Sequence, residues 1–228
     1  MAGYVLAVRP QPGLAATIAT AEKMGLNAIG YPLFEIVAQG WTCPDPSQID
    51  GLLIGSANAF RHSGAQLGQL KSKPVYAVGE TTAKVAREMG FEVAKAGTGG
   101  LQNLVDELGS IDPKLHLLRL AGARSVPLDP PQGLRISTEI VYEAKPLELP
   151  EPLRPLHDLG LTVLLHSAAA AEQFDKESRR LALERTRIKL VVIGPRVAES
   201  AGSGWHTVHV CERPSDRAML ELAAQMCI

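Results

Sequence analysis

Apolar residues along this chain follow two alternating patterns. Short runs of leucine, valine and isoleucine alternate with alanine-rich segments whose apolar residues recur at helical spacing. This alternation is typical of βα units that build a parallel sheet. The short runs predict strands near residues 4–8, 27–31, 51–55, 74–78, 91–94, 115–119, 135–142, 161–165, 188–193 and 206–210. The longer segments predict helices near residues 12–24, 57–69, 80–89, 99–109, 167–184, 195–202 and 215–226.

The pattern occurs twice along the chain. The segment around Ser167 resembles the segment around Ser56, and the segment around Gly194 resembles the one around Gly79, in the same order. A duplicated α/β sequence predicts two similar domains. Two such domains facing each other would enclose a cleft.

Two stretches with prolines in or beside them, near residues 33–37 and 141–146, occupy equivalent places in the repeat and predict connections between the domains. If the chain crosses at both, residues 1–34 and 147–228 form a discontinuous first domain, and residues 38–141 form the second. A single division near the middle of the chain is the alternative. The hydrophobic pattern alone does not decide between them.

Composition narrows the kind of ligand. Of the 228 residues, 46% are hydrophobic and 21% are charged, which is ordinary for a globular protein long enough to form two domains. A net charge of −1 and an aromatic content of 4% argue against nucleic acid as a partner. An anionic ligand would have to be bound locally, by backbone N–H groups and a few arginines.

The three cysteines have no metal-binding or redox spacing and predict free thiols in a reducing compartment. No signal-peptide pattern follows Met1, and no apolar stretch is long enough to cross a membrane. We therefore expect a cytoplasmic protein without a membrane partner. No interface patch stands out in the sequence, so we expect a monomer.

Candidate ligand-binding residues follow the predicted strands, where ligands bind in open parallel sheets. Ser56 and Ser167 each precede a predicted helix. A serine there caps the first turn, and the free N–H groups also attract anions, so capping alone and capping with anion binding both stay open. The same edge would carry Arg9, Gly79, Thr81, Thr82, Gly99, Arg119 and Gly194. For the arginines, a solvated surface position is the alternative.

Compact catalytic motifs are missing. The chain has no phosphate-binding glycine loop, no Gly-x-Ser-x-Gly turn, and no metal-binding spacing among its six histidines. Nucleotide binding and metal chemistry are therefore weakly supported.

A set of short segments is spread over nearly the whole chain: residues 8–10, 31–33, 55–58, 78–83 with Gly90, 99–101, Arg119 with Gly122 and Arg124, 141–142, 166–168 and 193–195. Together they resemble the uroporphyrinogen-III synthase family of tetrapyrrole biosynthesis. Each segment alone is weak, whereas their order and spacing together are fairly specific.

The resemblance implies an α/β fold of two similar flavodoxin-like parallel-sheet domains, joined by a two-stranded linker, with the first domain discontinuous. It also implies a lyase reaction. Linear hydroxymethylbilane, a tetrapyrrole poly-carboxylate, loses water and closes into uroporphyrinogen III, with the last pyrrole inverted through a spiro intermediate. Neither a cofactor nor a metal is needed.

The resemblance also implies roles for particular residues. Tyr142 is the candidate catalytic residue, as acid or hydrogen-bond donor for loss of the hydroxyl. Its alternative is a linker aromatic that packs between the domains. The residues expected to bind substrate are Arg9, Ser56, Asn58, Gly79, Thr81, Thr82, Gly99, Arg119, Ser167, Ala168, Gly194 and Pro195.

The chain departs from the family pattern in four places. Val197 and Gly55 stand where threonine is common, and His166 takes the place equivalent to Gly55. Residues 125–133 are too short and too rich in proline for the full helix expected after Arg124.

Two rival functions remain at the level of sequence. A non-catalytic two-domain protein that closes on a small anion would share the duplicated plan, although such proteins are more often exported. A nucleotide- or sugar-binding α/β enzyme is disfavoured by the missing phosphate loop.

Overall fold

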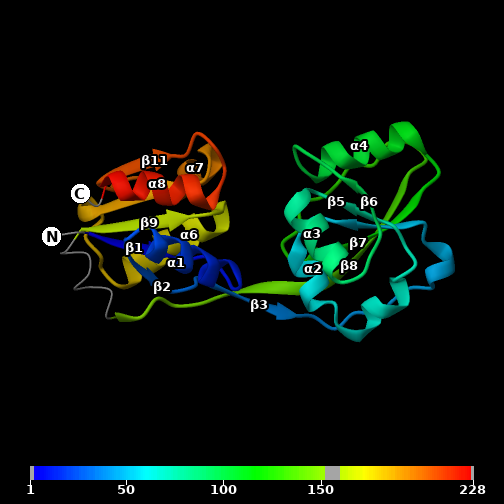
Figure 1. The fold of residues 1–228 in the computed structure, drawn as a ribbon, viewed down its shortest axis with the longest axis horizontal. Helices are drawn as coiled ribbons and strands as arrows, with labels where there is room; N and C mark the ends of the chain where they lie inside the picture. Colours follow the sequence, from blue (N-terminus) through cyan, green and yellow to red (C-terminus); the bar gives the residue numbers. More distant parts are fainter. Residues whose placement is uncertain (1–2, 152–159, 227–228) are drawn as a thin grey trace. The chain divides into compact units, whose positions relative to one another are not determined.

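The structure is a computed structural model that describes residues 3–151 and 160–226. Contacts within the chain divide it into two compact units (Figure 1). The first unit comprises Met1–Glu35 with Lys145–Ile228, and the second comprises Ile36–Ala144. Within the described residues, no helix is both long and apolar enough to cross a membrane.

The first unit contains a parallel sheet of five strands in the order β11-β10-β9-β1-β2. These strands are β1 (Tyr4–Ala7), β2 (Asn27–Gly30), β9 (Leu161–Leu165), β10 (Ile188–Val192) and β11 (Thr207–Val210). Its helices are α1 (Gly13–Lys23), α6 (Ala168–Arg180), α7 (Pro195–Ala201) and α8 (Asp216–Met226), with a short 3-10 turn at Arg185–Arg187. Helices α1 and α8 share a core with the sheet, in which Ala21 and Met219 pack with Val5, Leu164 and Val191. Helices α6 and α7 pack against each other.

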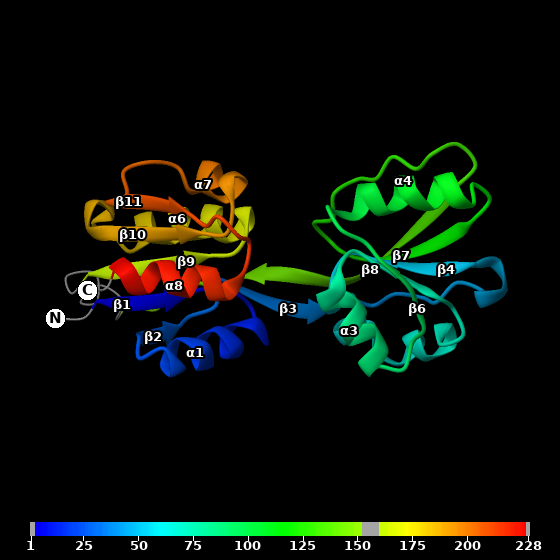
Figure 2. The same ribbon diagram turned by 45° about the horizontal axis from the view of Figure 1, so that its top comes forward.

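The sheet that runs through the second unit has the order β3-β8-β7-β4-β5-β6. These strands are β3 (Phe34–Ala38), β4 (Gly51–Ile54), β5 (Val75–Ala77), β6 (Val93–Ala96), β7 (His116–Gly122) and β8 (Arg135–Pro146). The helices are α2 (Ala57–His62), α3 (Glu80–Glu88) and α4 (Leu101–Ile111), with 3-10 turns at Pro46–Gln48 and Gly64–Leu70. Figure 2 shows α3 and α4 on opposite sides of this sheet.

Successive residues of β4 belong to different hydrophobic cores, because side chains along a strand point alternately to its two faces. Leu52 and Ile54 join the core that contains Phe60 of α2 and Ala83 of α3. Leu53 joins the core beneath α4. The continuous apolar run therefore reflects a strand that is covered on both faces.

The predicted α/β class is confirmed, and the second sheet is mixed because β3 joins it antiparallel. The Gln39 N–H donates to the Val141 carbonyl at 2.9 Å, and the Leu147 N–H donates to the Leu33 carbonyl at 2.8 Å. Residues 34–38, which the sequence indicated as a connection, thus form a strand paired with β8. The helix expected over residues 57–69 ends at His62 and is followed by a 3-10 turn, since Gly64 adopts φ +63°.

Equivalent strands occupy equivalent places in the two sheets. In the first, β1 lies between β2 and β9, and in the second, β7 lies between β8 and β4. The strands that follow, β10 and β11 in one sheet and β5 and β6 in the other, continue outward in the same order. The sequence repeat therefore corresponds to a repeated topology.

Helix α6 holds the chain where it leaves β8. The carboxylate of Glu177, only 1% exposed, accepts from the Leu149 N–H at 2.9 Å and from Arg180 at 2.7 Å. Arg180 also donates to the Leu149 carbonyl at 2.6 Å, and Gln173 donates to the Leu147 carbonyl at 3.1 Å. Burial acts to raise the pKa of Glu177, but the hydrogen bonds from Arg180 and Leu149 outweigh it and lower the pKa.

Replacing Glu177 with glutamine should destabilise the first unit. The change removes the charge that accepts from Arg180 and leaves a buried amide in its place, at a cost of about 1–3 kcal/mol. Urea unfolding followed by circular dichroism measures the loss. The matched control is Glu148→Gln, because Glu148 is 78% exposed and lies 3.8 Å from the same arginine.

The same comparison has a defined pH dependence. A lowered folded-state pKa means that Glu177 contributes stability above about pH 4.3, the ordinary glutamate value, and loses it as the pH falls further. The difference between wild type and Glu177→Gln should therefore shrink in acid. An undiminished difference at pH 3 would contradict this assignment.

Candidate active site

Helices of the second unit begin directly after its strands, at the carboxyl edge of the sheet. Ser56 follows β4, and its Oγ accepts from the Asn58 N–H at 3.2 Å, which is the capping role considered for it. Gly79 and Gly100 occupy the corresponding positions before α3 and α4, where no side chain caps the helix. Because Gly99 and Gly100 adopt φ +85° and +108°, the chain turns sharply into α4 and exposes its first N–H groups.

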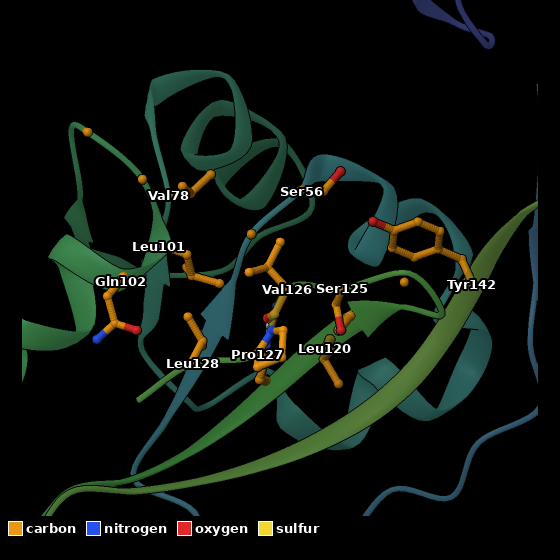
Figure 3. Close-up of a pocket in the computed structure, with 16 residues that line it drawn as sticks. Ser56, Val78, Leu101, Gln102, Leu120, Ser125, Val126, Pro127, Leu128 and Tyr142 are labelled. Carbon is orange, nitrogen blue, oxygen red and sulfur yellow. Dashed lines mark hydrogen bonds between the residues drawn. The ribbon is translucent and has the colours of Figure 1, made fainter. Parts of the chain in front are cut away.

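A cavity of about 440 Å³ opens at this edge (Figure 3). Its walls come from the ends of β4 and β5, the start of α4, strand β7 and the loop that follows it, and Tyr142 of β8. The lining residues are Gly55, Ser56, Val78, Gly99, Gly100, Leu101, Gln102, Arg119, Leu120, Ala121, Gly122, Ser125, Val126, Pro127, Leu128 and Tyr142. None of them is an aspartate or a glutamate, so Arg119 supplies the only formal charge of the lining.

Arg119 is buried, with 8% of its surface exposed. Its Nη1 donates to the Val126 carbonyl at 2.9 Å, and among the described residues no carboxylate pairs with it. Desolvation lowers the pKa of Arg119, while its interaction with Tyr142 acts in the opposite direction. An arginine so placed remains charged, since its ordinary pKa is above about 12, and its remaining N–H groups favour an anion.

The proline-rich segment 125–133 stands in place of a helix, as expected. Residues 125–133 contain no helix, and Ser125–Leu128 form one wall of the cavity. Gln102 holds the loop, because its Oε1 accepts from the Asp129 N–H at 3.0 Å and its Nε2 donates to the Asp129 carbonyl at 2.8 Å. Pro131 packs on Gly109, where a Cβ would lie 2.7 Å from the proline Cγ.

Tyr142 lies at the side of the cavity, and its hydroxyl points toward Ser56 in Figure 3. The ring is half-buried and packs against the core of the second unit. Its hydroxyl is therefore held at the cavity wall by a ring that is anchored in the protein.

The first unit carries a polar cluster at the corresponding edge of its sheet. Asp216, the first residue of α8, accepts from Arg9 at 3.1 Å and from Thr17 at 2.8 Å, and His166 Nε2 lies 2.7 Å from the same oxygen. Burial acts to raise the pKa of Asp216, but hydrogen bonds from His166 and Thr17, with the charges of His166 and Arg9, lower it overall. Ser167 next to this cluster caps α6 by accepting from the Ala170 N–H at 3.1 Å.

The cavity collects four of the residues expected from sequence: Ser56, Gly99, Arg119 and Tyr142. The other expected residues of this unit, Asn58, Gly79, Thr81 and Thr82, do not line it. Thr82 is 5% exposed, because its place in the first turn of α3 faces the sheet. Arg9, Ser167, Ala168, Gly194 and Pro195 belong to the first unit.

Sequence reasoning missed Gln102, the loop Ser125–Leu128 and Asp216. Gln102 and Asp129 lie 27 positions apart, and Arg9 and Asp216 lie 207 apart, so no local motif links them. Within the described part of the chain, no three histidine, cysteine, aspartate or glutamate side chains could hold a metal ion.

The fold and the cavity define an α/β protein with a pocket at the carboxyl edge of its second sheet, lined by one charged residue, Arg119. The family model described as uroporphyrinogen-III synthase HemD matches residues 15–221. The chain therefore belongs to the uroporphyrinogen-III synthase family, whose members are enzymes of porphyrin biosynthesis. A search of curated proteins finds no match.

Solved structures have the same fold. The chain is 20% identical to uroporphyrinogen-III synthetase from Helicobacter pylori, with a TM-score of 0.67 and 99% of each chain covered. It is 18% identical to a mutant uroporphyrinogen III synthase from Thermus thermophilus, with a TM-score of 0.53 and coverage of 98% of this chain and 99% of that one.

Replacing Gln102 with alanine should release the loop over the cavity. The change removes both hydrogen bonds to Asp129, so amide exchange in residues 123–131 should accelerate about tenfold, equivalent to about 1.4 kcal/mol. Hydrogen exchange with mass spectrometry measures the effect. Gln132→Ala is the matched control, since Gln132 is exposed and should leave the loop unchanged. Equal protection in both variants would exclude Gln102 as the anchor.

Proposed function

We propose that this protein is a uroporphyrinogen-III synthase and therefore a lyase that releases water. It cyclises linear hydroxymethylbilane, inverts the terminal pyrrole through a spiro intermediate, and forms uroporphyrinogen III. The observation that supports this beyond family membership is the charge of the cavity. A buried arginine that has no carboxylate partner among the described residues faces a space whose lining residues include no acid, which suits a substrate that is a poly-carboxylate.

Substrate carboxylates would be bound at the carboxyl edge of the second sheet. Arg119 supplies a fixed positive charge, and the uncapped N–H groups at the start of α4 supply directed donors. These groups are held in place by the Val126 carbonyl and by the Gly99–Gly100 turn. Binding then requires little rearrangement of the protein.

The first unit would bind carboxylates at its own strand ends. Arg9 follows β1, Ser167 and Ala168 begin α6, and Gly194 and Pro195 begin α7. Asp216 keeps the Arg9 guanidinium in place through a 3.1 Å ion pair. In the second unit, Asn58, Gly79 and Thr81 would contribute at the starts of α2 and α3, whereas the buried side chain of Thr82 would not.

Tyr142 would assist the first chemical step. Its hydroxyl donates a hydrogen bond or a proton to the hydroxyl that leaves the substrate, so that the carbon–oxygen bond breaks and water departs. The resulting cation is stabilised by the pyrrole nitrogen, and attack by the substituted carbon of the terminal pyrrole forms the spiro intermediate. The bond from this carbon to its original methylene bridge then breaks and leaves a cation at that methylene. The free α-carbon of the same pyrrole attacks this cation and loses its proton, which closes the macrocycle with the ring inverted. The enzyme's larger contribution is to hold the flexible chain in the geometry that favours attack by the substituted carbon.

The remaining features of the proposal concern organisation. Both units have the strand order 2-1-3-4-5 of flavodoxin-like sheets, if the second is counted from β7. Strands β3 and β8 would be the two-stranded linker. We also propose that the protein acts as a cytoplasmic monomer, without a cofactor or a metal.

The decisive experiment supplies freshly generated hydroxymethylbilane to the purified protein and separates the uroporphyrinogen isomers. Type III should exceed the control without enzyme, in which the non-inverted isomer forms. Tight binding of hydroxymethylbilane without an excess of type III would identify a binding protein in place of a synthase.

Arg119→Met should weaken substrate binding. The variant keeps much of the side-chain volume but removes the charged donor, so KM should rise about tenfold to a hundredfold. Steady-state kinetics of type III formation measures it. Arg135→Met is the control, because Arg135 is exposed at the opposite end of β8, and its KM should match wild type. An unchanged KM for Arg119→Met would remove Arg119 from the site.

Tyr142→Phe should slow the chemical step while leaving binding nearly intact. Loss of the hydroxyl should lower kcat about ten- to a hundredfold. Single-turnover kinetics of type III formation separates this step from product release. Tyr76→Phe is the control, since Tyr76 packs beneath α4 and does not line the cavity. A full rate in Tyr142→Phe would exclude the hydroxyl from the mechanism.

A further inference from the structure

The pairing of β7 with β8 is irregular at the place where Tyr142 sits. Ala121 pairs with Ile140, but Gly122 pairs with Tyr142, so Val141 is an extra residue on β8. Such bulges re-aim a side chain relative to a regular ladder. The Ala123 N–H donates to the Tyr142 carbonyl at 2.9 Å and fixes the backbone beyond the irregularity.

Because of the extra residue, the consecutive side chains of Val141 and Tyr142 both contact the same core. Val141 is fully buried in the core of the second unit, and the Tyr142 ring packs against the same core while its hydroxyl end reaches the cavity. In a regular strand, consecutive side chains point to opposite faces. The position of the tyrosine is therefore set by the bulge.

Gly122 leaves the space that the ring occupies. A Cβ on Gly122 would lie 2.6 Å from Cε2, 2.7 Å from Cζ and 3.0 Å from the hydroxyl oxygen of Tyr142. The hydroxyl end of the ring thus rests directly on the Gly122 backbone. Gly122 does not have the positive φ that favours glycine, so its backbone accepts alanine, and the tyrosine ring is what would have to move.

A second ring supports Tyr142. His62, the last residue of α2, has its ring centroid 6.3 Å from that of Tyr142, with the planes inclined by 42°. Burial lowers the pKa of His62, and the charge of Arg61 lowers it further. The histidine is therefore neutral near pH 7 and acts on Tyr142 through packing.

We propose that Gly122 and His62 are positioning residues that hold the Tyr142 hydroxyl at the reacting end of the substrate. This inference rests on the proposed synthase function and on the role of Tyr142 in it. Displacing the ring by even a fraction of an ångström costs rate when a donor must meet a leaving group, and it has little effect on carboxylates bound elsewhere. The signature is a loss in kcat with KM preserved.

Gly122→Ala tests the proposal in the full-length protein. We expect kcat for type III formation to fall about three- to thirtyfold, with KM within about twofold of wild type. Gly68→Ala is the matched control, because nothing lies within 4 Å of a Cβ at Gly68 and its φ is not positive. Thermal unfolding of both variants checks that the fold is retained.

A double-mutant cycle separates positioning from a general structural effect. In the Tyr142→Phe background there is no hydroxyl to displace, so adding Gly122→Ala should change kcat by less than about twofold. An equal loss in both backgrounds would show that Gly122 does not act through the hydroxyl and would overturn the proposal. Full activity of Gly122→Ala would overturn it as well.

His62 supplies an independent variant should Gly122→Ala fold poorly. His62→Ala removes the ring beside Tyr142 and should lower kcat about two- to fivefold, an effect that vanishes in the Tyr142→Phe background. His62→Phe retains an aromatic neighbour and should restore the rate. If the phenylalanine variant is as slow as the alanine variant, packing by His62 is excluded.

These outcomes are distinguishable from failure of the proposed function. If wild type produces no excess of type III uroporphyrinogen, the synthase proposal itself fails. If wild type is active but Gly122→Ala and His62→Ala are unaffected, only the positioning role fails.

Discussion

Within each sheet, the parallel strands end at one edge, and the helices that follow several of them begin with backbone N–H groups that lack helical partners. At α2 and α6, serine hydroxyls satisfy one of these groups. At α3, α4 and α7, the residue before the helix is glycine, and no side chain accepts a hydrogen bond from these N–H groups. The edge of each sheet therefore presents helix N-termini, which favour anionic groups.

The buried guanidinium of Arg119 strengthens this edge in the second unit. A buried charge is costly unless polar groups surround it, and among the described residues the Val126 carbonyl alone accepts a hydrogen bond from it. The loop that provides this carbonyl stands where the family pattern predicts a helix, and Gln102 holds it. The departure from the family pattern thus builds part of the cavity wall and leaves donors of Arg119 available to an anion.

A sheet irregularity sets the position of Tyr142, the proposed catalytic residue. In a strand that pairs regularly, successive side chains point to opposite faces of the sheet. The extra residue Val141 gives β8 a buried anchor beside a tyrosine whose hydroxyl reaches the cavity. The Tyr142 ring lies against the backbone of Gly122, where a side chain would collide with it. The rate of the reaction would then depend on a pairing register as much as on the identity of the catalytic residue.

The sequence by itself determined the α/β class, most strand and helix positions, the repeat and the residues after each strand. These follow from local periodicity and from the fact that parallel strands end at one edge, which is why Ser56, Gly99 and Arg119 were expected there. Tyr142 was expected from the resemblance to the family. Only the tertiary structure decided that Gln102 holds Asp129, that Asp216 holds Arg9, that Thr82 faces the core and that Gly122 accommodates Tyr142. Those contacts join residues distant in sequence or depend on a one-residue shift in pairing, and neither leaves a periodic signal along the chain.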